Sequence, residues 1–507
     1  MSSDLSMFSR FSVPALAAAL LSLLSIASIA FAGYKEDIGF TALQAELGAA
    51  TPDGSSLPLV TQCEAESLID HEADGRTDKV PVWMPDPANR EFSGKKIVDK
   101  SGSPPVYSGH ATGVGSRFYG KTSSIAPGIA SIESYLATDW LDQGFLKGNG
   151  AFKPAYTGGR VANHSWIGSA AGRDPGDLRR IDWVVGTDEY VQVVGPCRDH
   201  KPLLGSAFNT IAVGSAAGES GAGSIAVDAV YAAGRTCPQL VAPLKNASST
   251  VPVVAAAAAL LIELGHTDPG LSRDPAVRHT TNRNGDTITN AERSVVVKAA
   301  LMAGADRATH NSVMIDGITP NIDDYRMKPE DRTADGLDRR YGAGQLNIYN
   351  SYHIIAAGEQ NSREDAPAAG GAISDHGFDY DPFFGGQGGS NSVASYQFAV
   401  GKASGRLWAA LVWNIDIDAG GGPYFVGSAA LYDMDLLLYD VTEPAAPQLV
   451  AASSGSGGNT ENLWVELNGK RQYRLQVSPG AGQRAFNWDY ALAWRIESQD
   501  GRKPGER

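Results

Sequence analysis

The sequence predicts an α/β fold followed by an all-β sandwich, and three observations lead to this prediction. Short β-branched runs alternate with small-residue helical stretches between about residues 57 and 357, as is typical of a mostly parallel sheet flanked by helices. A stretch at 358–392 is rich in Gly, Ser, Asn and Asp. Beyond it, hydrophobic residues recur at every second position, as in strands with one buried face.

The elements of the first domain, at 33–357, follow from these patterns. Strands are expected at 57–63, 160–166, 190–194, 210–213 and 239–242. Helices are expected to begin near His110, Thr250 and Glu292. The apolar run at 251–264 carries Pro252 and Glu263 and is shorter than the ~20 residues that cross a bilayer, so we expect a buried helix.

The second half is expected to begin with a Gly-rich linker at 358–392, because such segments bury little surface and usually join domains. A jelly-roll-like β-sandwich is expected at 393–498, with alternating strands around residues 434–438, 463–467, 473–477 and 490–494. The residues at 499–507 are predicted to form a polar tail.

The first 32 residues have the pattern of a secretory signal peptide. Arg10 precedes an apolar stretch at 13–31 that ends in Ala30-Phe31-Ala32, an A-x-A cleavage pattern. A membrane anchor is the alternative, but Pro14 and several serines interrupt the segment. We expect a secreted, periplasmic or extracellular protein that is not held in a membrane after cleavage.

Composition narrows the range of functions. The chain of 507 residues has a net charge of −14 and no run of Lys or Arg, which argues against a nucleic-acid partner. Its 3 cysteines are too few for a disulfide scaffold. Cys63 and Cys197 are both expected at strand ends, where a disulfide and a reactive thiol are both open interpretations. We expect a soluble monomer.

Three segments carry residues suited to catalysis. Ser248 lies in residues 246–252 (NASSTVP), at the start of a helix whose free N–H groups could stabilise an oxyanion. His110 opens residues 110–116 (HATGVGS), where small neighbours leave the imidazole unobstructed. Glu64 ends a hydrophobic strand, where parallel sheets present functional groups. Acid, His and Ser in this order match one known order of a catalytic triad.

These segments resemble the subtilisin-like serine peptidases (subtilases, peptidase family S8). Residues 246–252 are similar to the motif GTSxAxP, and residues 110–116 to HGTHVAG. Residues 207–214 (AFNTIAVG), 237–243 (CPQLVAP) and 340–347 (RYGAGQLN) resemble later segments of the same domain. The resemblance implies a serine endopeptidase in which Ser248 is the nucleophile, His110 the base and Glu64 the orienting acid. Its substrate would be a protein or peptide.

The sequence departs from the family pattern at four points. Glu64 stands where the family has Asp, with Asp70 as an alternative acid. Residues 193–199 (VVGPCRD) lack the oxyanion-hole Asn, for which Arg198 and Asn163 are candidate replacements. Asn246 and Ala247 replace Gly and Thr, and 24 residues between Gly33 and the first strand leave no room for a full propeptide.

These departures leave a second hypothesis open, an inactive subtilase-fold protein that binds a partner at the cell surface, with its sandwich as the ligand-binding part. An α/β-hydrolase esterase is disfavoured because no G-x-S-x-G motif surrounds a suitable serine.

No cofactor or catalytic metal is expected. Residues 282–288 (NRNGDTI) have a faint calcium-loop pattern, but an Asn-Gly hairpin turn is the favoured interpretation. Asp416, Asp418, Asp433 and Asp435 could bind a structural calcium ion, although outward alternation along strands is favoured.

Overall fold

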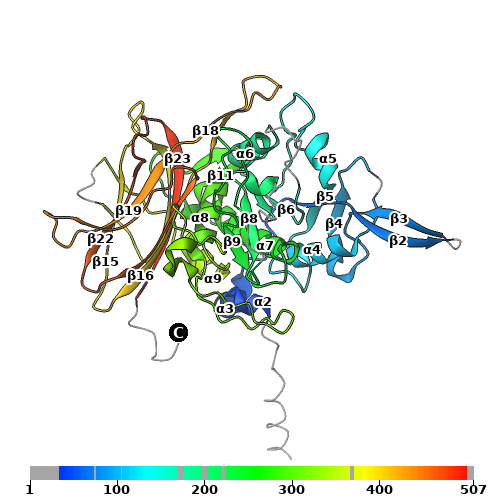
Figure 1. The fold of residues 1–507 in the computed structure, drawn as a ribbon, viewed down its shortest axis with the longest axis horizontal. Coiled ribbons are helices and arrows are strands. Elements are labelled where there is room, and N and C mark those ends of the chain that lie inside the picture. Colours follow the sequence, from blue (N-terminus) through cyan, green and yellow to red (C-terminus); the bar gives the residue numbers. More distant parts are fainter. Residues whose placement is uncertain are drawn as a thin grey trace, which may run out of the picture.

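The structure, a computed structural model, describes residues 33–73, 76–103, 105–168, 176–195, 203–218, 223–365 and 370–498. The predicted signal peptide at 1–32 and polar tail at 499–507 lie outside these described residues. The prediction of a parallel α/β part followed by an antiparallel β part is confirmed (Figure 1).

A seven-stranded sheet forms the centre of the α/β part, in the order β4-β5-β1-β6-β7-β8-β9. All neighbouring strands in it are parallel. The strands are β1 (Val60–Glu64), β4 (Lys96–Asp99), β5 (Ser131–Leu136), β6 (Val161–His164), β7 (Val191–Val194), β8 (Ile211–Ser215) and β9 (Leu240–Ala242). The five strands expected from the sequence are all present; β4 and β5 were not expected, and β4 lies at the edge, where half of its residues are exposed and its hydrophobic signal is weak.

Helices flank this sheet. They are α2 (Tyr34–Asp37), α3 (Phe40–Leu47), α4 (Gly109–Tyr119), α5 (Ala137–Asp142), α6 (Gly176–Asp188), α7 (Ala247–Thr267), α8 (Ser294–Gly304) and α9 (Ile348–Ala356). Two hairpins, β2 (Ser67–Ala73) with β3 (Arg76–Val82) and β10 (His279–Thr281) with β11 (Thr287–Thr289), complete this part. The second hairpin turns at residues 282–286, as the favoured Asn-Gly interpretation predicted.

Helix α7 is the central helix of the protein. Asn246 caps it by accepting the Ser249 N–H at 3.0 Å, and a run of alanines lets it pack closely against β6, β7 and β8. Its 21 residues are long and apolar enough to cross a membrane by length and composition, but most of them are buried inside the protein. The prediction of a buried core helix is confirmed.

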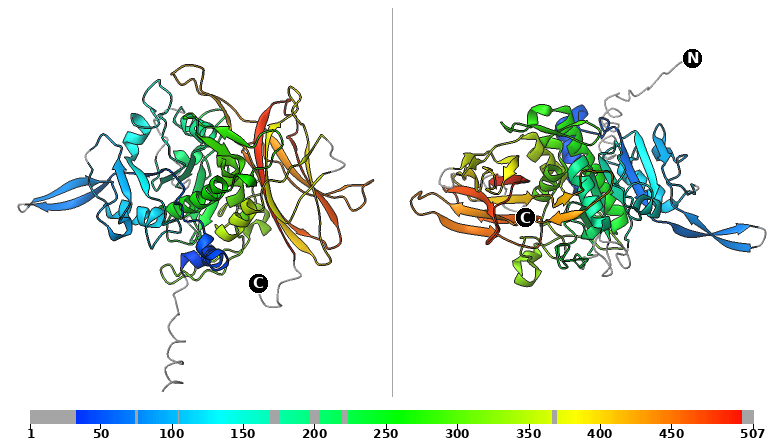
Figure 2. Two further views of the ribbon diagram at one scale, coloured as in Figure 1. Left: turned by 180° about the vertical axis from the view of Figure 1, so that it is seen from behind. Right: turned by 90° about the horizontal axis from the view of Figure 1, so that it is seen from above.

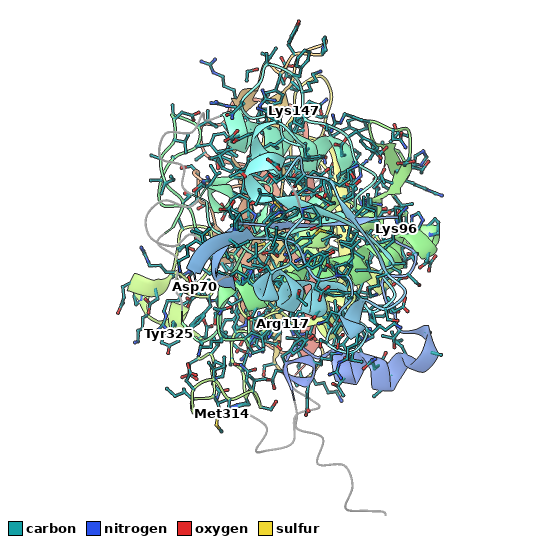
Figure 3. All side chains as sticks on the ribbon, turned by 90° about the vertical axis from the view of Figure 1, so that its right-hand side faces the viewer. Asp70, Lys96, Arg117, Lys147, Met314 and Tyr325 are labelled. Carbon is teal, nitrogen blue, oxygen red and sulfur yellow. The ribbon has the colours of Figure 1, made fainter. Side chains whose placement is uncertain are left out.

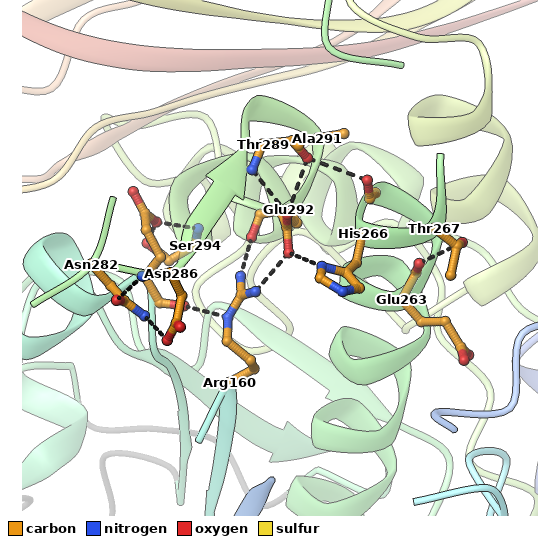
Figure 4. Close-up of polar contacts among 12 residues, drawn as sticks. Arg160, Glu263, His266, Thr267, Asn282, Asp286, Thr289, Ala291, Glu292 and Ser294 are labelled. Carbon is orange, nitrogen blue, oxygen red and sulfur yellow. Dashed lines mark hydrogen bonds and ion pairs between the residues drawn. The ribbon is translucent and has the colours of Figure 1, made fainter. Parts of the chain in front are cut away.

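A buried ion pair ties the start of β6 to the start of α8. Arg160 Nη1 donates to Glu292 Oε2 at 2.6 Å, and Arg160 Nη2 donates to the Glu292 carbonyl at 3.0 Å (Figure 4). Glu292 Oε1 accepts the Thr289 N–H at 2.9 Å in a capping box. His266 Nδ1, from the end of α7, lies 3.4 Å from Glu292 Oε2. One carboxylate therefore holds three segments together.

Two sheets form the C-terminal part, and all their strand pairs are antiparallel except that of β13 with β15. One has the order β14-β23-β16-β21 and the other β12-β15-β22-β19-β20, with β13 paired to β15. Their strands are β12 (Arg363–Glu364), β13 (Gly371–Ala372), β14 (His376–Phe384), β15 (Ala394–Ala399), β16 (Gly405–Val412), β19 (Met434–Asp440), β20 (Gln448–Ser453), β21 (Thr460–Leu467), β22 (Gln472–Pro479) and β23 (Trp488–Ser498). A small hairpin joins β17 (Asp416–Asp418) to β18 (Ser428–Ala430).

The first of these sheets is covered on both faces. One face contributes Phe384, Leu411 and Trp494 to a core shared with the second sheet. The other face contributes Phe378, Ala410 and Ala493 to the large core around α7 and α8. Figure 1 and Figure 2 show α8 and α9 between the parallel sheet and the sandwich, while the β2–β3 hairpin projects at the opposite end.

The prediction of a linker at 358–392 is wrong, because this region contains β12, β13 and β14. β14 is a strand of nine residues that pairs with β23 along most of its length. Phe378, Tyr380 and Phe384 are buried on it. The glycines that suggested a linker flank this strand instead, and Gly385, Gly386, Gly388 and Gly389 adopt positive φ in the turn that follows it.

Candidate active site

Glu64 and His110 form a carboxylate–imidazole pair at the carboxyl edge of the parallel sheet. Glu64 is the last residue of β1, and His110 lies in the first turn of α4. His110 Nδ1 is 3.2 Å from Glu64 Oε2. The carboxylate is 1% exposed, whereas the imidazole side chain is 45% exposed. The acid is therefore buried behind a histidine that solvent can reach.

The amide of Gln62 makes a second contact with the Glu64 carboxylate and fixes its orientation. Gln62 Nε2 donates to Glu64 Oε1 at 2.9 Å and to the Ala111 carbonyl at 2.8 Å. Tyr119 in turn donates its hydroxyl to Gln62 Oε1. All three side chains are buried. Glu64 Oε2, which accepts no hydrogen bond from any other described residue, is left facing His110.

Sequence reasoning missed Gln62 and Tyr119. The alternation of side chains along a strand could have identified Gln62, because it places the side chains of Gln62 and Glu64 on the same face of β1. Gly115 of α4 lets this pair approach the helix, because a Cβ at that position would lie 2.8 Å from Gln62 Oε1 and 2.5 Å from the Tyr119 hydroxyl. The small residues after His110 therefore serve close packing of α4 over the acid.

The contact with Glu64 changes the proton affinity of His110. Hydrogen bonding to the carboxylate raises the pKa of His110 above its ordinary value, and partial burial opposes this rise. Nδ1 faces the acid, so Nε2 is the nitrogen left for a reacting group. This is the arrangement that a general base needs in a triad.

Ser248 lies in the first turn of α7, which packs against α4. The side chain is half-buried, and its Oγ donates to the Ser165 carbonyl at 3.2 Å. Among the described residues no hydrogen bond joins Ser248 to His110. The Ser248 N–H belongs to the free end of the helix, where the helix dipole is positive.

Three other residues were predicted for the site, and the structure describes two of them, Asn163 and Asp70. Asn163 is fully buried on β6, and its amide nitrogen donates to Ser165 Oγ at 3.1 Å. Arg198 lies outside the described residues. Asp70, the alternative acid, is wrong: it lies exposed on the β2–β3 hairpin (Figure 3). There it pairs with Lys79 across the strands. Residues 67–70 of β2 are all exposed, so both faces of this part of the strand are at the surface, where Asp70 lies opposite Lys79.

The cysteines give no sign of a reactive thiol within the described residues. Cys63 is free and fully buried, and burial raises the pKa of its thiol well above the ordinary value, so the thiolate does not form near neutral pH. Cys237 is disulfide-bonded, and Cys197 lies outside the described residues. The described part of the chain also contains no group of three or more His, Cys, Asp or Glu side chains placed to hold a metal ion.

Comparison with solved structures finds partial likenesses. The chain is similar to a cold-adapted subtilisin-like serine proteinase, at 15% identity and a TM-score of 0.29, over 54% of this chain and 89% of that one. It is also similar to the PatG macrocyclase in complex with peptide, at 11% identity and a TM-score of 0.35, over 61% of this chain and 95% of that one.

A third likeness is to PliG of Aeromonas hydrophila, a periplasmic inhibitor of g-type lysozyme, at 14% identity and a TM-score of 0.14, over 21% of this chain and 75% of that one. No model of a protein family matches the sequence, and no curated protein sequence matches it significantly.

Proposed function

We propose that this protein is an exported serine endopeptidase of the subtilisin-like type, acting as a monomer on protein or peptide substrates. The observation that carries the proposal is the buried carboxylate of Glu64 at 3.2 Å from His110 Nδ1, at the sheet edge beside α7 and its Ser248. A buried acid, an accessible imidazole and a hydroxyl at a helix N-terminus are the parts that acyl transfer requires.

In the proposed reaction, His110 Nε2 removes the proton of Ser248 as Oγ attacks the peptide carbonyl. Glu64 stabilises the imidazolium that forms. The Ser248 N–H at the start of α7 stabilises the oxyanion, with Arg198 as the second candidate donor, because Asn163 is fully buried and already donates to Ser165 Oγ. The protonated His110 then gives its proton to the leaving amine, and water hydrolyses the acyl-enzyme. Before attack, the Ser248 hydroxyl must break its hydrogen bond to the Ser165 carbonyl and form one to His110 Nε2.

The test is covalent labelling with a fluorophosphonate probe, which reacts with activated serines. We expect wild type and Ser249→Ala to be labelled, because Ser249 lies next to the nucleophile but has no catalytic role here. Ser248→Ala and His110→Ala should not be labelled, and both should fail to degrade denatured casein. Equal labelling of wild type and Ser248→Ala would reject the mechanism.

One observation favours a second candidate, an inactive protein of the same fold that binds a partner. The Ser248 hydroxyl is engaged by the Ser165 carbonyl instead of by His110. This candidate predicts that wild type neither labels nor cleaves casein, although the Glu64–His110 pair is intact. Titration of His110 by NMR separates an intact but inactive site from a misfolded one, because only the folded site holds the pKa of His110 above its ordinary value.

A further inference from the structure

Arg307 is a buried cation that forms no ion pair with any residue that the structure describes. It follows α8, is 7% exposed, and its Nε and Nη1 atoms are both buried without a hydrogen-bond acceptor. The guanidinium group cannot lose its proton in a protein, so burial cannot be relieved by neutralisation. A buried charge of this kind normally has a counter-ion. None of the described residues supplies one.

Arg307 lines a cavity of about 530 Å³. The cavity lies where the two parts of the protein meet, since its wall includes Asn350 of α9, Trp408 of β16, Trp464 of β21 and Arg495 of β23. This volume falls within the range of small-molecule sites.

Two tryptophans in the same wall also have unused donors. The indole Nε1 atoms of Trp408 and Trp464 are buried, and no acceptor for them is found in the described part of the chain. Trp408 and Trp464 meet nearly edge to face, with ring centroids 6.4 Å apart. Three side chains around one cavity therefore each carry a buried N–H donor for which the described residues provide no acceptor.

The carboxylates that line the cavity do not fill this role, because each already has partners. Asp306 accepts from Asn347 Nδ2 at 2.6 Å and from Arg495 Nη2 at 3.3 Å. Asp324 forms an ion pair with Arg326 at 2.7 Å, and Glu497 pairs with Arg495. The remaining cation of the wall, Arg406, pairs with Glu466. Arg307 is the lining arginine that forms no ion pair within the described part of the chain.

We propose that this cavity binds the oxyanion group of a small-molecule ligand, a carboxylate or a phosphate, with Arg307 as its counter-ion and the indole N–H groups of Trp408 and Trp464 as further donors. An oxyanion supplies acceptors only, which is what the four unpaired donor nitrogens of these three side chains require. Guanidinium groups hold such anions through two parallel hydrogen bonds. The site is separate from the Glu64–His110 pair and does not depend on peptidase activity.

The test is isothermal titration calorimetry of the full-length protein with inorganic phosphate and with acetate, at constant ionic strength maintained with sodium chloride. Tighter binding of phosphate would identify a phosphate-bearing ligand, and tighter binding of acetate a carboxylate-bearing one. Arg307→Gln should weaken the preferred anion by about 10- to 100-fold, because it removes a charge-assisted contact. Arg363→Gln, at an exposed position of β12, should bind as wild type does.

Trp464→Phe keeps an aromatic ring but removes one donor, and it should weaken binding by about 2- to 10-fold. This variant decides the question if Arg307→Gln does not fold. In wild type, the indole N–H resonance that Trp464→Phe removes should move on addition of the anion. The proposal is overturned if neither anion binds wild type at about 100 mM, where a millimolar site would be saturated. It is also overturned if folded Arg307→Gln or Trp464→Phe binds with wild-type affinity.

Discussion

Replacing Glu64 with glutamine removes the negative charge behind His110 while keeping the size of the side chain. Glutamine can still accept the Gln62 amide hydrogen that now reaches Oε1. It cannot stabilise an imidazolium, and its own amide can face His110 Nδ1 and favour the wrong tautomer. The perturbation therefore tests whether the pair seen at 3.2 Å is a working acid and base.

The electrostatic stabilisation that Glu64→Gln removes can be worked out from the 3.2 Å between Glu64 Oε2 and His110 Nδ1. Two unit charges 3.2 Å apart interact by about 1 kcal/mol in water and about 5 kcal/mol at an effective dielectric constant of 20. The imidazole is 45% exposed, so solvent screening places the true value nearer the lower figure. The loss in turnover should be larger, about 10³- to 10⁴-fold, because the tautomer and orientation of the base are lost together with the charge.

The assay is the pH dependence of kcat/KM for a fluorogenic peptide. The contact with Glu64 raises the pKa of His110, so wild-type activity should fall as pH drops through a value above the ordinary histidine pKa, where the base becomes protonated. In Glu64→Gln the same fall should move to lower pH. Glu66→Gln, two residues further along and exposed, should keep both the rate and the pH profile of wild type. An unchanged rate and profile in Glu64→Gln would refute the triad.

Two further predictions concern buried charges that support the fold. Burial lowers the pKa of Lys298 to about 7, although its Nζ donates to the Phe208 and Thr210 carbonyls at 2.9 Å each. The unfolded chain then binds more protons than the folded one between pH about 7 and 10, so wild type should gain stability relative to Lys298→Met as pH rises through this window, by about 5 kcal/mol at most in urea unfolding. If the free energies of unfolding of the two proteins change with pH in the same way, this prediction is contradicted. Arg160→Met should lower the free energy of unfolding by about 3 to 5 kcal/mol, because it leaves the Glu292 carboxylate buried without its counter-ion. A loss below about 1 kcal/mol in urea unfolding would mean that the pair in Figure 4 contributes little.

Local patterns gave most of the elements correctly. The strands at β1 and β6 to β9 and the helices α4, α7 and α8 follow from periodicity and capping, which depend on residues close together in the sequence. The region at 358–392 was misinterpreted for the same reason. Its glycines are a strong local signal, while the pairing of β14 with β23 depends on residues more than a hundred positions later.

In the candidate site, too, local sequence patterns identified some residues, and tertiary packing determined the others. Motif spacing identified Glu64 and His110, and the structure brings these two residues together. It did not identify Gln62 and Tyr119, because a buried Gln that orients an acid has no signature until α4 is packed over β1. Nor did it foresee that the Ser248 hydroxyl would bond to the Ser165 carbonyl, which depends on how α7 packs beside β6.

The sequence by itself determined the fold class, the central helix and the order of acid, histidine and serine, because hydrophobic period and helix capping are properties of short segments. Only the tertiary structure decided that Glu64 and not Asp70 faces His110, that the sandwich packs directly on α8, and that Arg307 is buried at the junction without a counter-ion. The physical reason is that partners of buried polar groups come from distant segments, and their positions are fixed by sheet register and close packing.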